Sequence, residues 1–349
     1  MSAVRRVIFF NPYADRDTKG AARRIELLSV AIRRAGRSVD VVLKEEYASG
    51  PHSWMETWAA RKGLQRLAYF CAAGRLARQA DSVVVSEVIF IPTWRRNVVL
   101  TIHDLKAFDG RASRGGRLRA MAYKVFARLA CKIVVVSKSV KQDVVRHCGV
   151  SPAKVHVNYN GLADERIALA QRSRSSDKRY DFVYVSSFAR HKRHAMLVAA
   201  APVGARLCLI GRDLGSLDEV REQIARRGAD ITVDVFTDIG SDEELFALIG
   251  AAGSGIFPSV FEGFGIPLLE YAAAGLYVMA ADIAIFREIA DYVDCFFPAD
   301  DEAALQEAMT DFLRHRPVGK PTASDLLRNG EFSEDAVSRA FIDIVDAAV

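Results

Sequence analysis

Short apolar runs alternate with longer amphipathic stretches along the first half of the chain. The runs have the length and β-branched content of buried strands, and they cover Val4–Phe10, Val39–Leu43, Ser82–Pro92, Val98–Ile102, Ile133–Ser137 and Val155–Asn158. Helical patterns lie between them at Gly20–Gly36, Arg114–Cys131 and Ser139–Cys148. Buried strands separated by helices predict a parallel sheet with helices on both faces.

The same alternation restarts in the second half. Strand-like runs cover Phe182–Ser186, Arg206–Gly211, Ile231–Phe236, Ser254–Pro258 and Val278–Ala280. The helical patterns between them are His194–Ala201, Ser216–Arg227, Asp242–Ala252 and Pro267–Gly275. The pattern predicts an α/β protein of two facing doubly wound, Rossmann-like domains with a ligand cleft between them.

The domain boundaries follow from composition. Gln171–Arg179 is a run of nine polar residues, which is typical of a linker. We therefore expect a first domain over 1–165, a linker over 166–180 and a second domain over 181–332. An amphipathic helix within 333–349 is expected to pack back on the first domain.

Composition narrows the class of protein. Half of the 349 residues are hydrophobic and 26% are charged, which excludes a disordered chain. The apolar runs are too short to span a bilayer, and we expect no signal peptide. The five cysteines are odd in number and far apart, so we expect reduced thiols and a cytoplasmic location rather than disulfides or a zinc site.

Positive charge is concentrated in the first half of the chain. Residues 1–165 carry a net charge of about +15 and the remainder about −10, and Arg61–Arg78 and Arg111–Lys132 are basic stretches without an acid. Trp54 and Trp58 precede the first of them. Such stretches fit an anionic membrane surface, a solvated helix or a nucleic acid. Because the sequence has no nucleic-acid-binding signature, we favour peripheral attachment to the inner face of the cytoplasmic membrane and expect no nucleic-acid partner.

The segment FPSVFEGFGIPLLE carries the most specific chemistry. A strand ends, the glycines Gly263 and Gly265 make a turn, and a helix opens near Pro267. Two carboxylates, Glu262 and Glu270, flank the turn. A helix N-terminus binds phosphate and a carboxylate binds a sugar diol, so the segment favours a sugar-plus-phosphate ligand. A plain strand–turn–helix connection with solvated glutamates is the alternative.

This segment resembles the signature of glycosyltransferase family 4, retaining enzymes of the GT-B fold that use nucleotide-activated sugars. The following text, YAAAGLYVMAADIAIFREIAD, resembles the family's continuation. The resemblance implies that Glu262 faces the donor sugar together with the amides of Gly263, Phe264 and Gly265. It implies that Glu270 binds the ribose hydroxyls.

Further segments match the family in the same order. VSSFARHKRHAML resembles the loop in which an Arg and a Lys hold the donor diphosphate. Lys192 matches that Lys, whereas Ser187 occupies the usual Arg position, so Arg190 or Arg193 would supply the missing charge. Without the resemblance, this segment is only a basic loop.

Two residues of the first half also match. TIHDL places His103 near the transferred sugar by resemblance, although a strand-end His is otherwise often a structural hydrogen bonder. Gly20 matches one glycine of a pair that approaches phosphate and acceptor in the family.

The resemblance implies a retaining hexosyltransferase, with a mannose-type sugar preferred. The donor would be a nucleoside diphosphate sugar and the acceptor a saccharide or lipid-linked saccharide, as in cell-surface polysaccharide or lipopolysaccharide synthesis. We expect no cofactor and no essential metal, because no metal-binding motif marks the sugar site. The alternatives are a sugar-nucleotide epimerase, a non-catalytic sugar-nucleotide-binding protein, and an NAD-dependent oxidoreductase for which Gly211–Gly215 (GRDLG) is the nearest dinucleotide motif.

Overall fold

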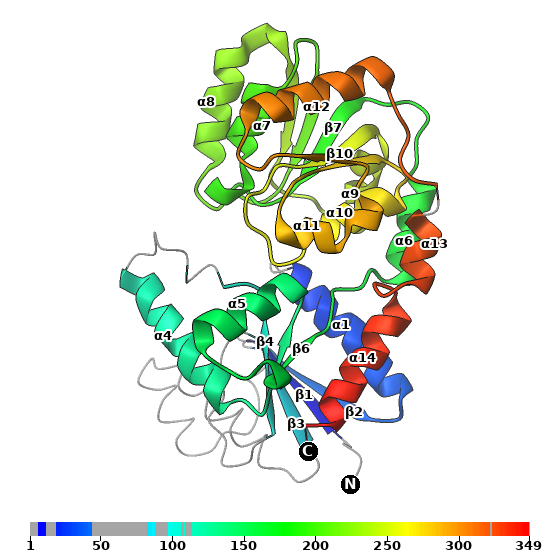
Figure 1. The fold of residues 1–349 in the computed structure, drawn as a ribbon. Coiled ribbons are helices and arrows are strands. Elements are labelled where there is room, and N and C mark those ends of the chain that lie inside the picture. Colours follow the sequence, from blue (N-terminus) through cyan, green and yellow to red (C-terminus); the bar gives the residue numbers. More distant parts are fainter. Residues whose placement is uncertain are drawn as a thin grey trace, which may run out of the picture. The chain divides into compact units, whose positions relative to one another are not determined.

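A computed structural model describes residues 6–11, 19–43, 82–87, 97–105, 108, 114–321 and 323–348. The chain forms two compact units. The first comprises Met1–Gly161 together with Glu334–Val349, and the second comprises Leu162–Ser333 (Figure 1).

The first unit is built on a parallel six-stranded sheet in the order β2-β1-β3-β4-β5-β6. Helices α1 and α14 lie on one face of this sheet, and α4 and α5 lie on the other (Figure 1). In chain order the elements within the described residues are β1 (Arg6–Asn11), α1 (Lys19–Arg34), β2 (Ser38–Leu43), β3 (Ser82–Glu87), β4 (Val98–Ile102), α4 (Arg114–Leu129), β5 (Lys132–Val135), α5 (Lys138–Cys148), β6 (Val155–Val157) and α14 (Glu334–Asp346).

The second unit has a parallel six-stranded sheet in the order β12-β11-β10-β7-β8-β9. Helices α7, α8 and α12 cover one face, and α9 and α10 cover the other (Figure 1). In chain order the elements are α6 (Asp164–Arg172), β7 (Tyr180–Val185), the 3₁₀ turn η4 (Arg190–Lys192), α7 (His194–Ala200), β8 (Arg206–Ile210), α8 (Leu217–Arg227), β9 (Thr232–Phe236), α9 (Asp242–Gly250), β10 (Ala252–Phe257), α10 (Ile266–Ala273), β11 (Tyr277–Ala281), α11 (Ala284–Glu288), β12 (Cys295–Phe297), α12 (Glu302–His315) and α13 (Ala323–Asn329).

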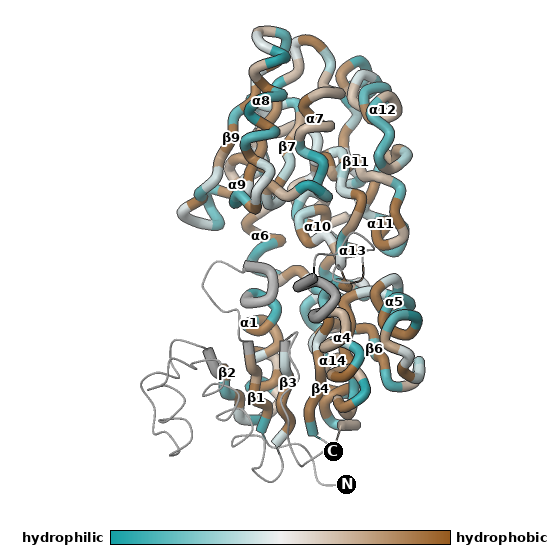
Figure 2. The backbone as a smooth tube through the Cα atoms, turned by 90° about the vertical axis from the view of Figure 1, so that its left-hand side faces the viewer, coloured by the Kyte–Doolittle hydropathy of each residue, from teal (hydrophilic) through white to brown (hydrophobic). Residues whose placement is uncertain are grey.

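Apolar runs of the sequence form the central strands of both sheets, whose residues are buried under helices on both faces. The central strands β4 and β7 are buried along nearly their whole length, as expected for a sheet with helices on both faces. In Figure 2, β1 and β4 accordingly appear largely brown, the colour of hydrophobic residues.

The chain's last helix, α14, completes the core of the first unit. The ring of Phe341 stacks on that of Phe9 in β1, with 5.9 Å between centroids. Val337 and Val345 join the same buried cluster. Because α14 packs on α1 and β1, the chain ends in the unit in which it begins.

The predicted linker over 166–180 is wrong in part. Residues 164–172 form α6, which buries Ile167 and Ala170 inside the second unit. The polar run after it is a surface turn, in which Lys178 Nζ donates to the carbonyl of Gly250 at 2.8 Å. The chain instead passes between the units at Gly161–Leu162 and again at Ser333–Glu334.

Candidate functional site

The site lies where the strand order of the second sheet reverses. The chain moves outward from β7 to β9, returns to the centre, and then moves outward from β10 to β12. Strands β7 and β10 are therefore parallel neighbours whose connections turn in opposite directions, and ligands of open α/β sheets bind at such a switch point. The loops that follow these two strands, 186–193 and 258–265, contain most of the predicted site residues.

An ion pair joins the two loops. Lys192 Nζ lies 2.5 Å from Glu262 Oε1, and the two side chains are only 14% and 9% exposed. The backbone supports the contact, because the N–H of Val260 donates to the carbonyl of His191 at 3.1 Å. The structure thus brings together the predicted diphosphate-binding lysine and the predicted sugar-facing glutamate.

A buried tyrosine contacts both loops. The hydroxyl of Tyr184 in β7 donates to the carbonyl of Lys192 at 3.0 Å and lies 2.7 Å from the hydroxyl of Ser259. Burial raises the pKa of Tyr184 far above its usual value, and the negative charge of Glu262 adds to the rise. Tyr184 therefore stays a neutral donor, a role that its place in an apolar strand gave no reason to expect.

The glycine turn is shaped by backbone and packing. Gly265 caps α10 with a φ of 104°, and a Cβ at this position would lie 2.9 Å from the ring of Phe286. Phe264 is buried, and its ring contacts that of Phe332 with 5.8 Å between centroids. The side chain of Phe264 is thus part of the core, and only its backbone amide is suited to the predicted contact with the donor.

The second glutamate is buried with a cation of its own. Glu270 lies in the second turn of α10, and its Oε1 accepts from Arg166 Nη2 at 2.5 Å and from Nε at 3.2 Å. Arg166 belongs to α6 and also donates to Asp242. Sequence reasoning missed Arg166, because it precedes Glu270 by 104 positions and no motif marks it.

The two candidate substitutes for the missing arginine differ. Arg193 has a positive φ of 59° and pairs with Asp300, with 2.6 Å between Nη2 and Oδ1. Arg190 is exposed, and its guanidinium makes no hydrogen bond or ion pair with any residue that the structure describes. Arg190 is consequently the cation of this loop that is available to a ligand.

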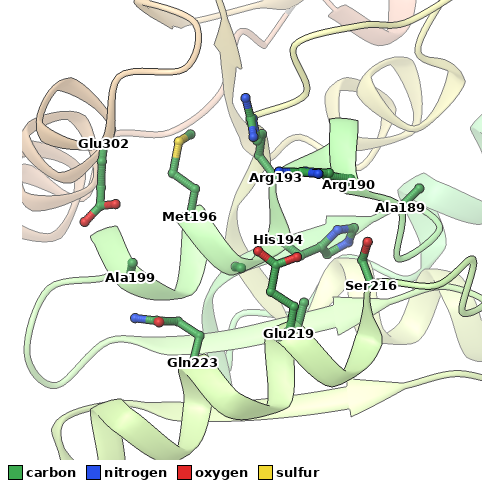
Figure 3. A pocket seen from close by; sticks show the side chains of 12 residues that line it. Ala189, Arg190, Arg193, His194, Met196, Ala199, Ser216, Glu219, Gln223 and Glu302 are labelled. Carbon is green, nitrogen blue, oxygen red and sulfur yellow. The ribbon is translucent and has the colours of Figure 1, made fainter. Parts of the chain in front are cut away.

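A pocket of about 250 Å³ lies beside this loop, between α7 and α8. Figure 3 shows Arg190 and Arg193 at this pocket, with Glu302 across from them and Glu219 and Gln223 of α8 below. Neither Lys192 nor Glu262 lines it. We therefore distinguish this pocket from the switch-point site.

His194 forms part of the support of the loop. Its ring packs against those of Tyr184 and Phe188, with centroid distances of 4.4 and 4.5 Å. Burial lowers the pKa of His194 to about 3, and the charge of Lys192 contributes. The ring is therefore neutral at physiological pH and acts as a packing group.

The remaining predicted residues belong to the first unit. His103 is half-buried and follows β4 directly, and Gly20 is the second residue of α1, after β1. Both sit beyond carboxyl ends of strands, as the sequence led us to expect; their roles stay predictions. The basic stretch Arg61–Arg78, Trp54 and Trp58 lie outside the described residues.

The segment Gly211–Gly215 does not form a dinucleotide-binding motif in the structure. Gly211 follows β8, not the first strand of the sheet, and a Cβ there would lie 1.9 Å from the carbonyl oxygen of Ser186. Asp213 accepts hydrogen bonds from the N–H groups that open α8, at 2.7 Å from Gly215. These glycines thus serve close backbone packing and a helix cap.

Two findings concern metals and membranes within the described residues. No group of three His, Cys, Asp or Glu side chains there is placed to hold a metal ion. No described helix combines the length and apolar character needed to cross a bilayer.

Two doubly wound units, each with a parallel six-stranded sheet, define the GT-B class of α/β proteins. The family description "Glycosyl transferases group 1" matches residues 165–331, and "Glycosyltransferase Family 4" matches residues 18–166. Together the two matches cover most of the sequence, and the chain belongs to the family-4-type glycosyltransferases.

Individual relatives are distant. The O-antigen chain mannosyltransferase RfbU of Salmonella typhimurium is 23% identical over 221 residues, which are 61% of this chain and 60% of RfbU. The match thus spans less than two thirds of that relative.

Solved structures match along nearly the whole chain. Anabaena Alr3699/HepE in complex with UDP and glucose has a TM-score of 0.69 at 14% identity, covering 98% of this chain and 99% of HepE. WaaG, described as a glycosyltransferase involved in lipopolysaccharide biosynthesis, has a TM-score of 0.68 at 15% identity, covering 97% and 99%. These likenesses show the fold.

Proposed function

We propose that this chain is a retaining glycosyltransferase that moves a hexose from a nucleoside diphosphate sugar to a saccharide or lipid-linked saccharide. The observation that carries the proposal is the Lys192–Glu262 pair, which lies at the switch point beside the glycine turn that opens α10. Family membership and the names of the relatives support it. The names of RfbU and WaaG favour cell-surface polysaccharide or lipopolysaccharide synthesis and a mannose-type donor.

The donor diphosphate would bind between Lys192 and the N-terminus of α10. Both supply positive potential where the leaving group gains negative charge, and both are fixed before the donor arrives. Arg190 would add the charge that Ser187 does not supply. Glu262 would then exchange part of its contact with Lys192 for hydroxyls of the donor sugar, and Glu270 would hold the ribose.

The proposed chemistry follows the family mechanism. The bond between the sugar's anomeric carbon and the diphosphate oxygen breaks, and the acceptor hydroxyl oxygen bonds to that carbon on the same face. The acceptor proton passes to a phosphate oxygen of the leaving group, so no protein base is needed. His103 would lie near the transferred sugar, and the reaction would run without a metal, which activity in excess EDTA tests.

Donor turnover tests the proposal. Lys192→Ala and Glu262→Gln should each abolish most sugar transfer, whereas Lys178→Ala should not. Lys178 is a matched control, because it is a half-buried lysine that precedes β7 whereas Lys192 follows it. Full turnover in both site variants would refute the site.

The same assay separates the alternatives. Sugar transfer to an acceptor identifies a transferase, and conversion of the donor to an epimer without an acceptor identifies an epimerase. Nucleotide binding without any turnover identifies a binding protein. Thermal-shift screening with UDP, GDP, ADP and dTDP identifies the base, because ligand at about 100 times its dissociation constant adds about 2.7 kcal/mol of stability.

Peripheral attachment to an anionic membrane is the second part of the proposal. On α4, Met121, Val125 and Leu129 follow one another at intervals of four residues and are 61%, 45% and 55% exposed. Lys124 and Arg128 are exposed beside this stripe. An exposed apolar stripe flanked by cations fits the interface of a bilayer with anionic headgroups.

Liposome flotation tests the attachment. Wild-type protein should float with vesicles that contain phosphatidylglycerol and much less with phosphatidylcholine alone. Replacing the three apolar residues of the stripe by Ser should reduce flotation. Replacing Val203, Leu214 and Val318, which are exposed apolar residues of the second unit, should not. Equal flotation of both triple variants would refute a role for α4.

A further inference from the structure

Arg166 is held from three directions. Its Nε and Nη2 donate to Glu270 Oε1, and its Nη1 donates to Asp242 of α9. Its guanidinium also lies over the ring of Phe246, 4.9 Å from the centroid. The planar group is thus fixed by α9 as well as by α10, so its orientation does not depend on Glu270 alone.

The side chains of Arg166 and Glu270 are buried to different extents. The Glu270 side chain is 2% exposed and that of Arg166 is 12% exposed, whereas Asp242 is considerably more open to solvent. A carboxylate this deep needs a countercharge, and two donors on one oxygen restrict the rotation of the carboxylate plane. A lysine at position 166 would keep the charge but not the fork.

We infer that Arg166 is a positioning residue for the nucleotide: it holds the Glu270 carboxylate in the orientation that recognises the ribose diol of the donor. This inference rests on the proposed function, and specifically on the predicted role of Glu270. It assigns a task to α6, the first helix after the chain enters the second unit. A purely structural tie between α6 and α10 is the competing explanation.

A comparison of ribose and dideoxyribose probes separates the two. UDP and GDP and their 2′,3′-dideoxy counterparts are titrated into the full-length wild-type protein, Arg166→Lys, Glu270→Gln and the control Arg174→Lys. Arg174 donates to Ala273 O at the other end of α10, so it controls for loss of an arginine contact to the same helix.

The expected result is a selective loss. Wild type and Arg174→Lys should bind the ribose form of the accepted nucleotide about tenfold or more tighter than the dideoxy form, as expected for hydrogen bonds to a charged group. In Arg166→Lys and Glu270→Gln this ratio should fall to near one, with affinity for the dideoxy form unchanged. Adding Arg166→Lys to Glu270→Gln should change the ratio no further.

Each other outcome contradicts a particular claim. If Arg166→Lys keeps the wild-type ratio, or weakens both probes equally, the arginine is only structural and the inference fails. If wild type binds both forms equally, the role of Glu270 and the inference fail together while the diphosphate site stands. If wild type binds no nucleotide, the proposed function fails first. Asp242→Asn, which loosens Arg166 from its more exposed side, should give an intermediate ratio if Arg166→Lys does not fold.

Discussion

The Lys192–Glu262 pair should stabilise the second unit even without a donor. Lys192→Met leaves the largely buried Glu262 carboxylate without its cation, and Glu262→Gln does the reverse. Breaking a fully buried pair costs about 3–5 kcal/mol, and an exposed pair is worth less than about 1 kcal/mol. With side chains 14% and 9% exposed, we expect a loss of about 2 kcal/mol for each single variant.

The double variant makes the test sharp. Lys192→Met/Glu262→Gln leaves no unpaired charge, so it should recover most of the lost stability and show a coupling of about 2 kcal/mol. Urea denaturation measures the four unfolding free energies. For a unit of about 170 residues, a loss of 2 kcal/mol lowers the melting temperature by about 4–8 °C.

The double variant should recover stability but not nucleotide binding. The double variant lacks both the cation and the carboxylate, so its thermal shift with nucleoside diphosphate should stay near zero while its unfolding free energy approaches that of wild type. Lys178→Met serves as the control for removal of a lysine. Additive losses in the double variant would refute the pair, because two groups that do not touch have no coupling.

Three further predictions address the surroundings of the pair. Gly265→Ala should cost about 1–3 kcal/mol in urea denaturation and weaken nucleotide binding, because its φ of 104° strains any residue with a Cβ. Burial lowers the pKa of His194 to about 3, so the unfolded state binds the extra proton below about pH 6.5 and stability falls as pH decreases toward 3. The unfolding free energy measured at pH 7 and pH 5 should therefore drop by about 2 kcal/mol more in wild type than in His194→Phe. Arg190→Ala should weaken binding of nucleoside diphosphate in calorimetry, whereas Arg193→Ala, whose arginine already pairs with Asp300, should not.

Each of these has a contradicting outcome. Wild-type affinity in Gly265→Ala would mean that the turn relaxes without moving the loop. Equal pH dependence in His194→Phe would mean that folding does not lower the pKa of His194. Equal losses in Arg190→Ala and Arg193→Ala would mean that the ion pair of Arg193 opens for the ligand.

The local part of the fold could be predicted from the sequence, because burial on both faces leaves a continuous apolar run. Such runs located β4 and β7 within one or two residues. The helix α12 was missed although Leu305, Met309 and Phe312 recur at helical intervals and are buried. The linker was misplaced because polar composition does not distinguish a surface turn from a connection between units.

The candidate site also contains residues that local sequence signals reveal and residues that they do not. The turn residues from Glu262 to Gly265 could be found from one continuous segment, because a strand end, two glycines and a helix start are all local signals. Their partners come from elsewhere: Lys192 lies 70 positions before Glu262, and Arg166 lies 104 positions before Glu270. Only the pairing of β7 with β10 and the packing of α6 on α10 bring them together.

The spacing of the two glutamates alone gives the wrong electrostatic expectation for this site. Two carboxylates with seven residues between them at a helix start would repel a diphosphate. In the structure each has its own cation, from η4 for Glu262 and from α6 for Glu270, so their charges are balanced before a donor binds. The dipole of α10 then supplies net attraction, and we propose that the guanidinium of Arg190, which pairs with no described residue, adds to it. A site built in this way can use carboxylates to recognise sugar hydroxyls and still accept a doubly charged leaving group, provided that both cations remain in place.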